Sequence, residues 1–131
     1  MIALDTHTLV WWASADDSLS RKAKRAIEQE LDGGEIIVSA ISAWEIAMLV
    51  EREKLVLSMD VDRWLATVAE IAAVRIVPVD VEISVKSVNL PGEFHKDPAD
   101  RMIVATARKF AIPLVTKDEK IRAYPHVKTL W

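Results

Sequence analysis

Four acidic residues stand at positions where a small α/β protein would bring their carboxylates together. They are Asp5, Glu45, Asp100 and Asp118. Asp5 ends a short apolar run that begins at Ile2, and Asp118 follows a second apolar run over residues 113–116, while Glu45 and Asp100 lie in the first turn of expected helices. Acidic groups at strand ends and helix starts can share one edge of a parallel sheet, which is where such sheets bind ligands. This placement predicts a cluster of carboxylates that binds Mg²⁺ or Mn²⁺.

The chemistry of such a cluster follows from its charge. Three or four carboxylates at close range cannot all stay ionised without a partner, because like charges raise each other's pKa. A hard divalent cation with oxygen ligands relieves that repulsion. It can also lower the pKa of a bound water, hold a phosphate oxygen and stabilise a leaving oxygen, and none of these roles needs a His or Cys nucleophile. The four residues therefore predict the catalytic and metal-binding site of a metal-dependent nuclease.

Each of these acidic residues also has a local explanation as a helix cap. The segment Ser42–Glu45 matches a capping box, with Glu at the third helical position. Asp97 can cap the helix whose first turn contains Asp100, and Asp5 and Asp118 can cap the turns that follow them. The alternative function is therefore a non-catalytic binding or regulatory module, in which the carboxylates cap helices and an aromatic surface binds a partner.

A second enzymatic alternative is an aspartate-based phosphatase with Asp5 as its nucleophile. Sites of that kind commonly have a second Asp two residues further on. His7 occupies that position in this chain. The nuclease interpretation is therefore favoured over the phosphatase.

Strands that alternate with helices would position these residues. The sequence predicts five strands, at residues 2–5, 35–39, 75–79, 113–116 and 127–130, and each of the first four contains a short apolar run. Helical patterns and capping residues predict helices at residues 7–13, 20–32, 42–53, 60–73, 81–89, 98–110 and 119–123. This alternation predicts βαβ units, with a mostly parallel sheet covered by helices on both faces. Residues 1–131 contain no internal repeat or linker, so we expect a single domain.

Composition narrows the classes of protein to which the chain can belong. Its 131 residues are 51% hydrophobic, and its formal net charge of −3 is unusual for a general binder of polyanions. It contains no cysteine, so it has neither disulfides nor thiolate metal sites, as fits a reducing cytosol. A strand from residue 2 leaves no room for a signal peptide, and the apolar runs are too short to span a bilayer. We therefore expect a cytoplasmic protein without membrane contacts.

The motifs around the four carboxylates resemble those of PIN-domain ribonucleases, and most closely the VapC-type toxins of bacterial and archaeal toxin–antitoxin pairs. The matching segments are Leu4–His7, Ser39–Glu45, Asp97–Ala107 and Leu114–Asp118, and the match covers essentially the whole chain. The resemblance implies a Rossmann-like PIN fold and a Mg²⁺- or Mn²⁺-dependent endoribonuclease that is the toxin of a type II toxin–antitoxin system. It implies hydrolysis of RNA phosphodiesters by a metal-activated water. It also implies a cognate antitoxin, and a homodimer or a toxin–antitoxin hetero-oligomer.

The same resemblance implies roles for individual residues. Metal ligation falls to Asp5, Glu45 and Asp100 and, more loosely, to Asp118, usually with bridging waters. Asp97 is an auxiliary acidic position that is a cap first and a ligand second. Thr116 occupies a position where the family often has a small hydroxyl residue beside the metal pocket, and Thr6 can assist through its backbone N–H or its hydroxyl.

Basic side chains near these motifs could form a rim that contacts RNA phosphates, as phosphate binding requires. Lys96, Arg101, Lys117 and Lys120 are close in sequence to Asp97, Asp100 or Asp118. The alternative is ordinary solvated charge, or a pairing of Arg101 with a nearby carboxylate. His7 and His95 could likewise contact RNA, or they could be ordinary surface histidines.

The chain also has five tryptophans, a high number for its length. Trp11 and Trp12 are adjacent and cannot both face the same side of a helix, so at least one should be partly exposed. Exposed tryptophan suits a protein–protein surface. We therefore expect a hydrophobic groove near the early helices, lined by Trp11, Trp12, Ile46, Leu49 and Val50, where a partner chain would bind.

Overall fold

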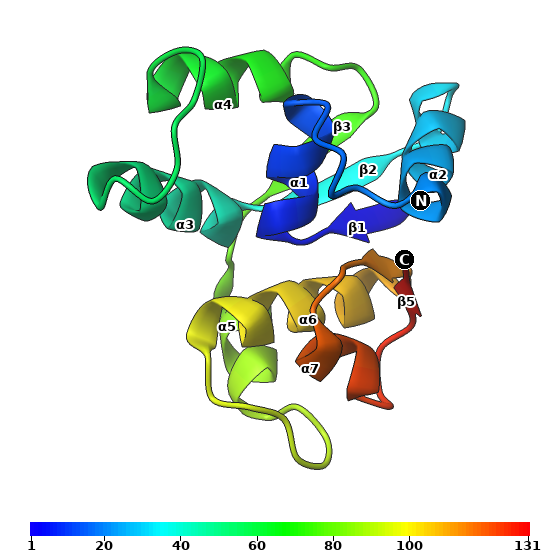
Figure 1. Cartoon of the computed structure of the whole chain (residues 1–131). Helices are drawn as coiled ribbons and strands as arrows, with labels where there is room; N and C mark the ends of the chain where they lie inside the picture. Colours follow the sequence, from blue (N-terminus) through cyan, green and yellow to red (C-terminus); the bar gives the residue numbers. More distant parts are fainter.

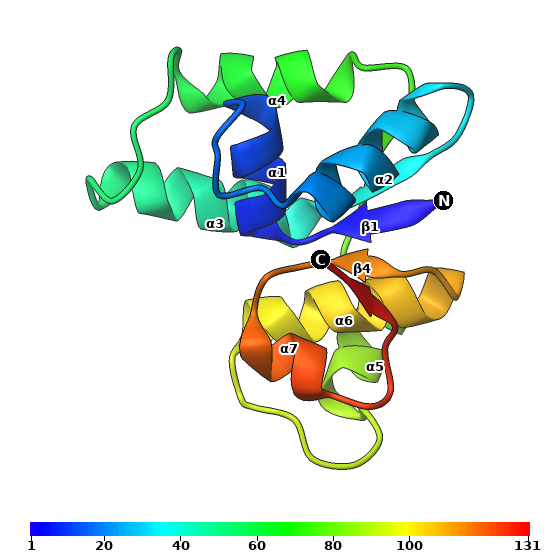
Figure 2. The same cartoon turned by 45° about the vertical axis from the view of Figure 1, so that its right-hand side comes forward.

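A computed structural model describes residues 1–131 and places all five strands in one sheet (Figures 1 and 2). The strands are β1 (Ile2–Leu4), β2 (Ile36–Ser39), β3 (Val74–Val77), β4 (Leu114–Val115) and β5 (Thr129–Leu130). Every pairing is parallel, and the strand order is β3-β2-β1-β4-β5. The predicted α/β fold is confirmed, with a sheet that is entirely rather than mostly parallel.

The helices cover both faces of this sheet, as predicted. They are α1 (Thr6–Ala13), α2 (Arg21–Leu31), α3 (Ala40–Glu51), α4 (Val61–Ala69), α5 (Val81–Val88), α6 (Pro98–Phe110) and α7 (Glu119–Ala123). Helices α1 to α4 contribute to one buried cluster, and α5 to α7 contribute to the other. In Figures 1 and 2 the two groups of helices lie on opposite sides of the sheet. None of the helices is both long and apolar enough to cross a membrane.

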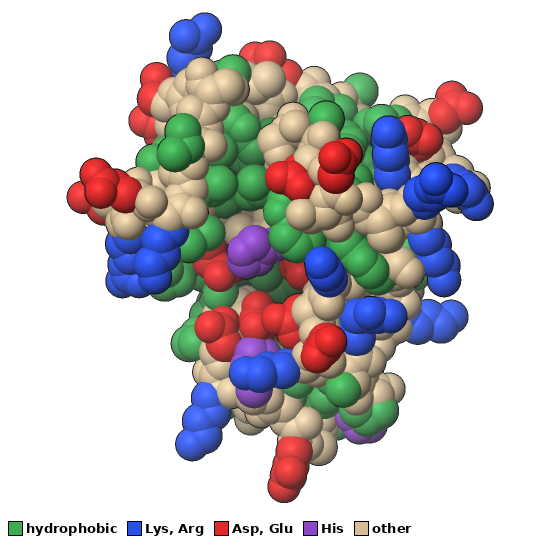
Figure 3. Space-filling model, viewed as in Figure 1, with side chains coloured by type: hydrophobic (Ala, Val, Ile, Leu, Met, Phe, Trp, Pro, Cys, Tyr) green, Lys and Arg blue, Asp and Glu red, His purple; other side chains and the backbone are tan.

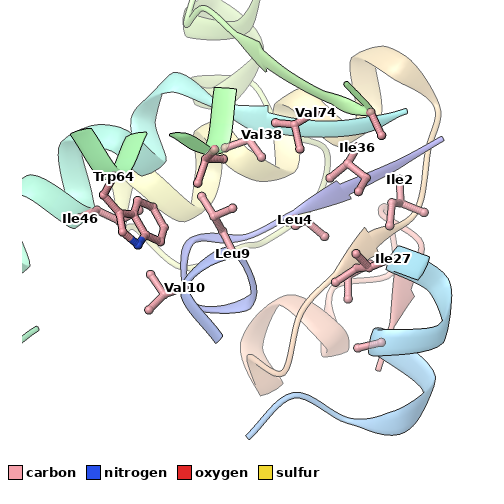
Figure 4. Packing of buried hydrophobic residues seen from close by; sticks show 14 residues of the cluster. Ile2, Leu4, Leu9, Val10, Ile27, Ile36, Val38, Ile46, Trp64 and Val74 are labelled. Carbon is pink, nitrogen blue, oxygen red and sulfur yellow. The ribbon is translucent and has the colours of Figure 1, made fainter. Parts of the chain in front are cut away.

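The two central strands are buried on both faces, which explains their uninterrupted apolar sequences. In β1, Ile2 and Leu4 face the first cluster and Ala3 faces the second. In β2, Ile36 packs with the first cluster (Figure 4) and Ile37 with the second. Each fully buried isoleucine or leucine among these contributes about 1.5–3 kcal/mol to stability. The core therefore fixes the register of the strands whose ends form the site.

The register brings three polar residues together at the carboxyl edge of the sheet. Leu4 pairs with Val38 on one side and with Val115 on the other. The residues that come next in the chain are Asp5, Ser39 and Thr116. Helices α1 and α3 begin directly after Asp5 and Ser39, so the first turns of both helices also lie at this edge.

The start of α3 differs from the prediction. The helix begins at Ala40, and Ser39 caps it by accepting a hydrogen bond from the backbone N–H of Ile41 at 3.2 Å. Ser42 is fully buried inside the helix, so the predicted capping box over Ser42–Glu45 is wrong. The reason is that β2 runs into α3 with no intervening loop, because Ser39 both ends the strand and has the extended backbone of an N-cap. Glu45 consequently lies in the second turn and caps nothing.

The end of α4 differs as well, since the helix stops at Ala69 rather than near residue 73. The carbonyl of Ala73 accepts a hydrogen bond from the N–H of Ile36 at 2.7 Å, so the chain must leave the helix early enough to join the sheet. Pro78 follows β3, which is the edge strand of the sheet, as the sequence predicted for a proline there.

Candidate active site

A pocket of about 520 Å³ opens at the carboxyl edge of the sheet. It is lined by Asp5, Thr6, His7, Trp11, Glu45, Asp97, Asp100, Lys117, Asp118 and Glu119. All four predicted carboxylates are among these residues, and each comes from a different part of the chain. Figure 3 shows acidic side chains gathered in a hollow in the middle of this face, between the two groups of helices.

Asp5 is buried and both of its oxygens accept hydrogen bonds. Oδ1 accepts from the backbone N–H of Thr8 at 2.9 Å, which caps α1, and Oδ2 accepts from the hydroxyl of Thr116. The oxygen of the same hydroxyl accepts from the backbone N–H of Asp118 at 3.0 Å. Thr116 therefore ties the end of β1 to the turn before α7, beside the pocket.

Thr116→Val tests this connection. The substitution should destabilise the protein by about 1–3 kcal/mol, because the N–H of Asp118 and Oδ2 of Asp5 each lose a hydrogen-bond partner in a largely buried place. Thr106→Val is a matched control, since Thr106 is equally buried but its hydroxyl bonds only to the Met102 carbonyl one turn earlier. Urea unfolding of both variants measures the difference, and equal losses of stability would contradict the connecting role.

Glu45 is half-buried, and its oxygen Oε1 accepts a hydrogen bond from the hydroxyl of Thr6. The same Thr6 oxygen lies 2.9 Å from Oγ of the buried Ser42. Burial raises the pKa of Glu45, the hydroxyl of Thr6 opposes this, and the charge of Asp97 adds to it. The side-chain hydroxyl of Thr6 thus holds this carboxylate in place.

Asp100 has the most perturbed carboxyl group of the cluster. Burial, followed by the charges of Asp97, Asp118, Glu45 and Asp5, raises its pKa to about 7. No lysine or arginine forms a salt bridge with any of the four predicted ligands. The one basic group in contact is His95, whose Nε2 lies 3.1 Å from Oδ2 of Asp100.

The donor set of the pocket fits a hard divalent cation. All four predicted ligands offer carboxylate oxygens, which Mg²⁺ and Mn²⁺ prefer, and no salt bridge to a lysine or arginine offsets their mutual repulsion. As the side chains stand, no three His, Asp or Glu residues have the geometry to hold one ion. The type, charge and burial of the donors are therefore the features that favour a metal ion.

Helix capping explains some of these acidic residues but not all. Asp5, Asp97 and Asp118 each cap a helix, through hydrogen bonds from the backbone N–H groups of Thr8, Asp100 and Lys120 at 2.9 Å. The side chains of Glu45 and Asp100 cap nothing. Capping alone therefore gives no reason for these two carboxylates to turn into the same pocket.

The basic residues of the predicted RNA-binding rim do not all lie beside the acidic pocket. Lys117 lines the pocket, with Nζ 5.7 Å from the ring centre of Trp11, and Lys120 lines an adjoining hollow. Lys96 and Arg101 line neither of these. The guanidinium of Arg101 donates to four backbone carbonyls, those of Ser87, Val88, Phe94 and His95, at 2.8–3.2 Å. The predicted alternative of a pairing between Arg101 and a carboxylate is therefore wrong, because α6 aims this side chain at the end of α5. An RNA-contacting role for Arg101 stays a prediction.

The predicted hydrophobic groove is also corrected. Ile46 is fully buried, and Trp12 packs against the core cluster on the α1–α4 side. Trp11 forms a wall of the acidic pocket instead, with its ring 5.7 Å from that of His7. The exposed tryptophan is Trp44, because it lies on the outer face of α3.

Two further residues at the site, His95 and Glu119, had no clear signal in the sequence. The sequence predicts that His95 is an RNA contact or a surface histidine, whereas the structure places it against Asp100. Glu119 lines both hollows only because it follows Asp118 into α7. For both His95 and Glu119, the sequence indicates a place at the site only through their closeness in sequence to Asp100 and Asp118.

Comparison with known proteins agrees with this geometry. The model of the PIN domain family matches residues 2–127. Ribonuclease VapC22 of Mycobacterium tuberculosis is 39% identical over 132 residues, which cover 99% of this chain and 98% of that protein. Among solved structures, VapC20 of M. tuberculosis, described as a sarcin-ricin loop cleaving toxin, superposes with a TM-score of 0.67 at 18% identity over 98% of this chain and 99% of the other. VapBC2 of Rickettsia felis, solved with a DNA fragment from its promoter, gives 0.70 at 17% identity over 98% and 97%. The chain therefore belongs to the PIN domain family, as a member of the VapC type.

Proposed function

We propose that this protein is a Mg²⁺- or Mn²⁺-dependent endoribonuclease and the toxin of a type II toxin–antitoxin pair. The observation that carries the proposal is the pocket in which Asp5, Glu45, Asp100 and Asp118 converge without a salt bridge to any lysine or arginine. The identity of 39% with a protein named as a ribonuclease supports the same activity. The substrate is then an RNA phosphodiester that reaches this pocket.

The carboxylates, hydroxyls and lysines at the site have different roles in this proposal. Asp5, Glu45, Asp100 and Asp118 would hold the cation, which when bound supplies an activated water and positive charge for the phosphate oxygens. Thr116 and Thr6 orient Asp5 and Glu45 by hydrogen bonds. Lys117 lines this pocket and Lys120 lines the adjoining hollow, and in this proposal their charges attract the phosphates of the RNA strand.

The substrate in this proposal is single-stranded or looped RNA. The bases of A-form duplexes are hard to reach, so sequence-specific recognition mostly uses unpaired bases that stack on side chains. The pocket offers one aromatic wall, Trp11, next to its carboxylates. An unpaired strand could lie along this wall with a phosphate over the acidic cluster.

A cognate antitoxin is the second part of the proposal. The R. felis relative was solved as a VapBC assembly on promoter DNA. In this chain Val81, Val85 and Val88 are exposed on one face of α5, and Trp44 is exposed on α3. Apolar surface of this kind commonly marks protein–protein contact. We propose that an antitoxin, a second copy of the chain, or both cover these surfaces.

The test is cleavage of total RNA by the purified protein. We expect discrete fragments with Mg²⁺ or Mn²⁺, none with EDTA, and recovery when the cation is restored. Asp118→Asn should lower the rate at least about tenfold, because it removes a charged ligand, while Asn still caps α7. Asp60→Asn is the matched control, since Asp60 caps α4 in the same way but lies outside the pocket.

The alternative of a non-catalytic module predicts a different result. If the acidic residues only cap helices, the two Asn variants should behave alike, and neither cation nor chelator should affect RNA. Cleavage that persists in EDTA would point to a contaminating or metal-independent nuclease. Either result would overturn the proposed function.

A further inference from the structure

The segment between α5 and α6 lacks regular secondary structure but is held at several points. Arg101 bonds to carbonyls at both ends of the segment, those of Val88 and His95 among them. The hydroxyl of Tyr124 donates to the carbonyl of Pro91 at 2.5 Å in the middle. Residues 89–97 are therefore fixed to the body of the protein by hydrogen bonds from α6 and from the residue after α7.

The ring of His95 has a defined position in this segment. The ring packs edge-on against Phe94, with centroids 4.5 Å apart, and Phe94 in turn packs against Tyr124 at 4.7 Å. The side chain of His95 is only 23% exposed. Its position is therefore set by packing on one side and by the backbone bond to Arg101 on the other.

Nε2 of His95 is the informative atom. It is shielded from solvent and has no hydrogen-bond partner with good geometry. The acceptor within reach is Oδ2 of Asp100, at 3.1 Å but out of line. Because a buried N–H without an acceptor is costly, a small rotation of either side chain that aligns the two atoms is favourable. A neighbouring carboxylate also selects the tautomer with its proton on Nε2.

Asp100 lies between two hollows. One is the acidic pocket, and the other, of about 460 Å³, is lined by His95, Asp97, Asp100, Asp118, Glu119 and Lys120. His95 borders the second hollow and not the first. Its contact therefore engages Oδ2 of Asp100 and leaves Oδ1, which accepts no hydrogen bond, available to the acidic pocket.

We propose that His95 is a positioning residue, which donates from Nε2 to Oδ2 of Asp100 and holds that carboxylate in the orientation that a divalent cation requires. The inference rests on the proposed function. Asp100 and Arg101 are adjacent, so the first turn of α6 supplies both the carboxylate and the anchor of the histidine that orients it. Loss of such a partner of a metal ligand typically costs 10–100-fold in metal affinity or activity.

Three substitutions at this position separate orientation from simple packing. His95→Leu fills the space but donates nothing. His95→Gln can bring an amide N–H close to the position of Nε2, whereas the shorter His95→Asn brings it close to that of Nδ1, away from Asp100. The two amides are alike in polarity, so a difference between them reports the donor at Nε2.

The experiment measures Mn²⁺ binding to the full chain by calorimetry without RNA, together with kcat, KM and thermal unfolding. We expect His95→Leu and His95→Asn to lower Mn²⁺ affinity and kcat about tenfold or more with KM unchanged, and His95→Gln to recover most of the loss. Unchanged Mn²⁺ affinity in His95→Leu, or equal losses in Gln and Asn variants, would overturn the positioning role. In that case the proposed function stands if the wild type still cleaves, whereas a wild type that neither binds Mn²⁺ nor cleaves RNA overturns both.

Discussion

Glu45→Gln should lower kcat for RNA cleavage by about 10²–10³-fold, since charge stabilisation by a bound metal is worth several kcal/mol and each 1.4 kcal/mol is tenfold. The substitution keeps the shape of the side chain, and Oε1 of the amide can still accept the hydrogen bond from Thr6. It removes only the negative charge. Because burial raises the pKa of Glu45, its charge is unfavourable in the metal-free fold, and we expect Gln to leave stability unchanged or slightly higher.

The matched control for this prediction is Glu51→Gln. Glu51 is the last residue of the same helix and is exposed outside the pocket. Both variants are to be compared in kcat, KM and urea unfolding at saturating Mg²⁺. A Glu45→Gln variant that is folded and cleaves RNA at the rate of Glu51→Gln would remove Glu45 from the proposed site.

The layout of the fold was predictable because its signals are local. Short apolar runs mark four of the five strands, and the sequence predicts the helix Pro98–Phe110 with its observed ends. In that helix Asp97 caps and Pro98 occupies the first position, and no competing start lies nearby. Once strands and helices alternate in sequence, a parallel sheet follows, and its carboxyl edge collects the residues after each strand.

The start of α3 shows where local signals fail. Ser39 and Ser42 are both good caps, and the Ser42–Glu45 segment has the stronger local pattern. Ser39 is the cap because of strand pairing. It pairs with Val77 as the last residue of β2, and the helix begins at the next residue. The observed start matters for the site, because a helix that begins at Ala40 leaves Glu45 with no capping role.

The convergence of the carboxylates was predicted, but the side chains that serve them were not fully predictable. The resemblance places Thr116 beside the pocket, but its hydrogen bond to Asp5, from 111 residues away, depends on the register between β1 and β4. His95 meets Asp100 only because Arg101 fixes the intervening loop through backbone carbonyls. Every residue has a backbone carbonyl, so hydrogen bonds to carbonyls cannot be recognised from side-chain types. The sequence therefore suggests RNA or a carboxylate as the partner of Arg101 and does not reveal these carbonyls.

Without a metal, Asp100→Asn should stabilise the protein at pH 8 and have little effect near pH 4. In the folded protein the pKa of Asp100 is raised to about 7 by burial and by its acidic neighbours, and its ordinary value is 3.8. Between these two values the folded protein binds more protons than the unfolded chain, so stability falls as pH rises through this window. Above pH 7 the full cost of ionising Asp100 is present.

The size of the effect follows from the displacement of this pKa. A displacement of about three pH units corresponds to at most about 4 kcal/mol, and because water reaches the partly exposed side chain we expect about 2 kcal/mol at pH 8. Asn removes this cost, and its backbone N–H still bonds to the Asp97 cap. Urea unfolding of both proteins in EDTA, at intervals between pH 4 and pH 8, measures the difference, and parallel curves would contradict the prediction.

Addition of the cation should then reverse the order of the two proteins. At a concentration 100 times the dissociation constant, a ligand that binds only the folded state adds about 2.7 kcal/mol of stability. The wild type has the full set of carboxylates and should gain this amount from Mn²⁺ at pH 8, while Asp100→Asn should gain much less. The same charge that weakens the metal-free fold is therefore the charge that binds the metal, and a variant stabilised in EDTA but not by Mn²⁺ would locate both effects at Asp100.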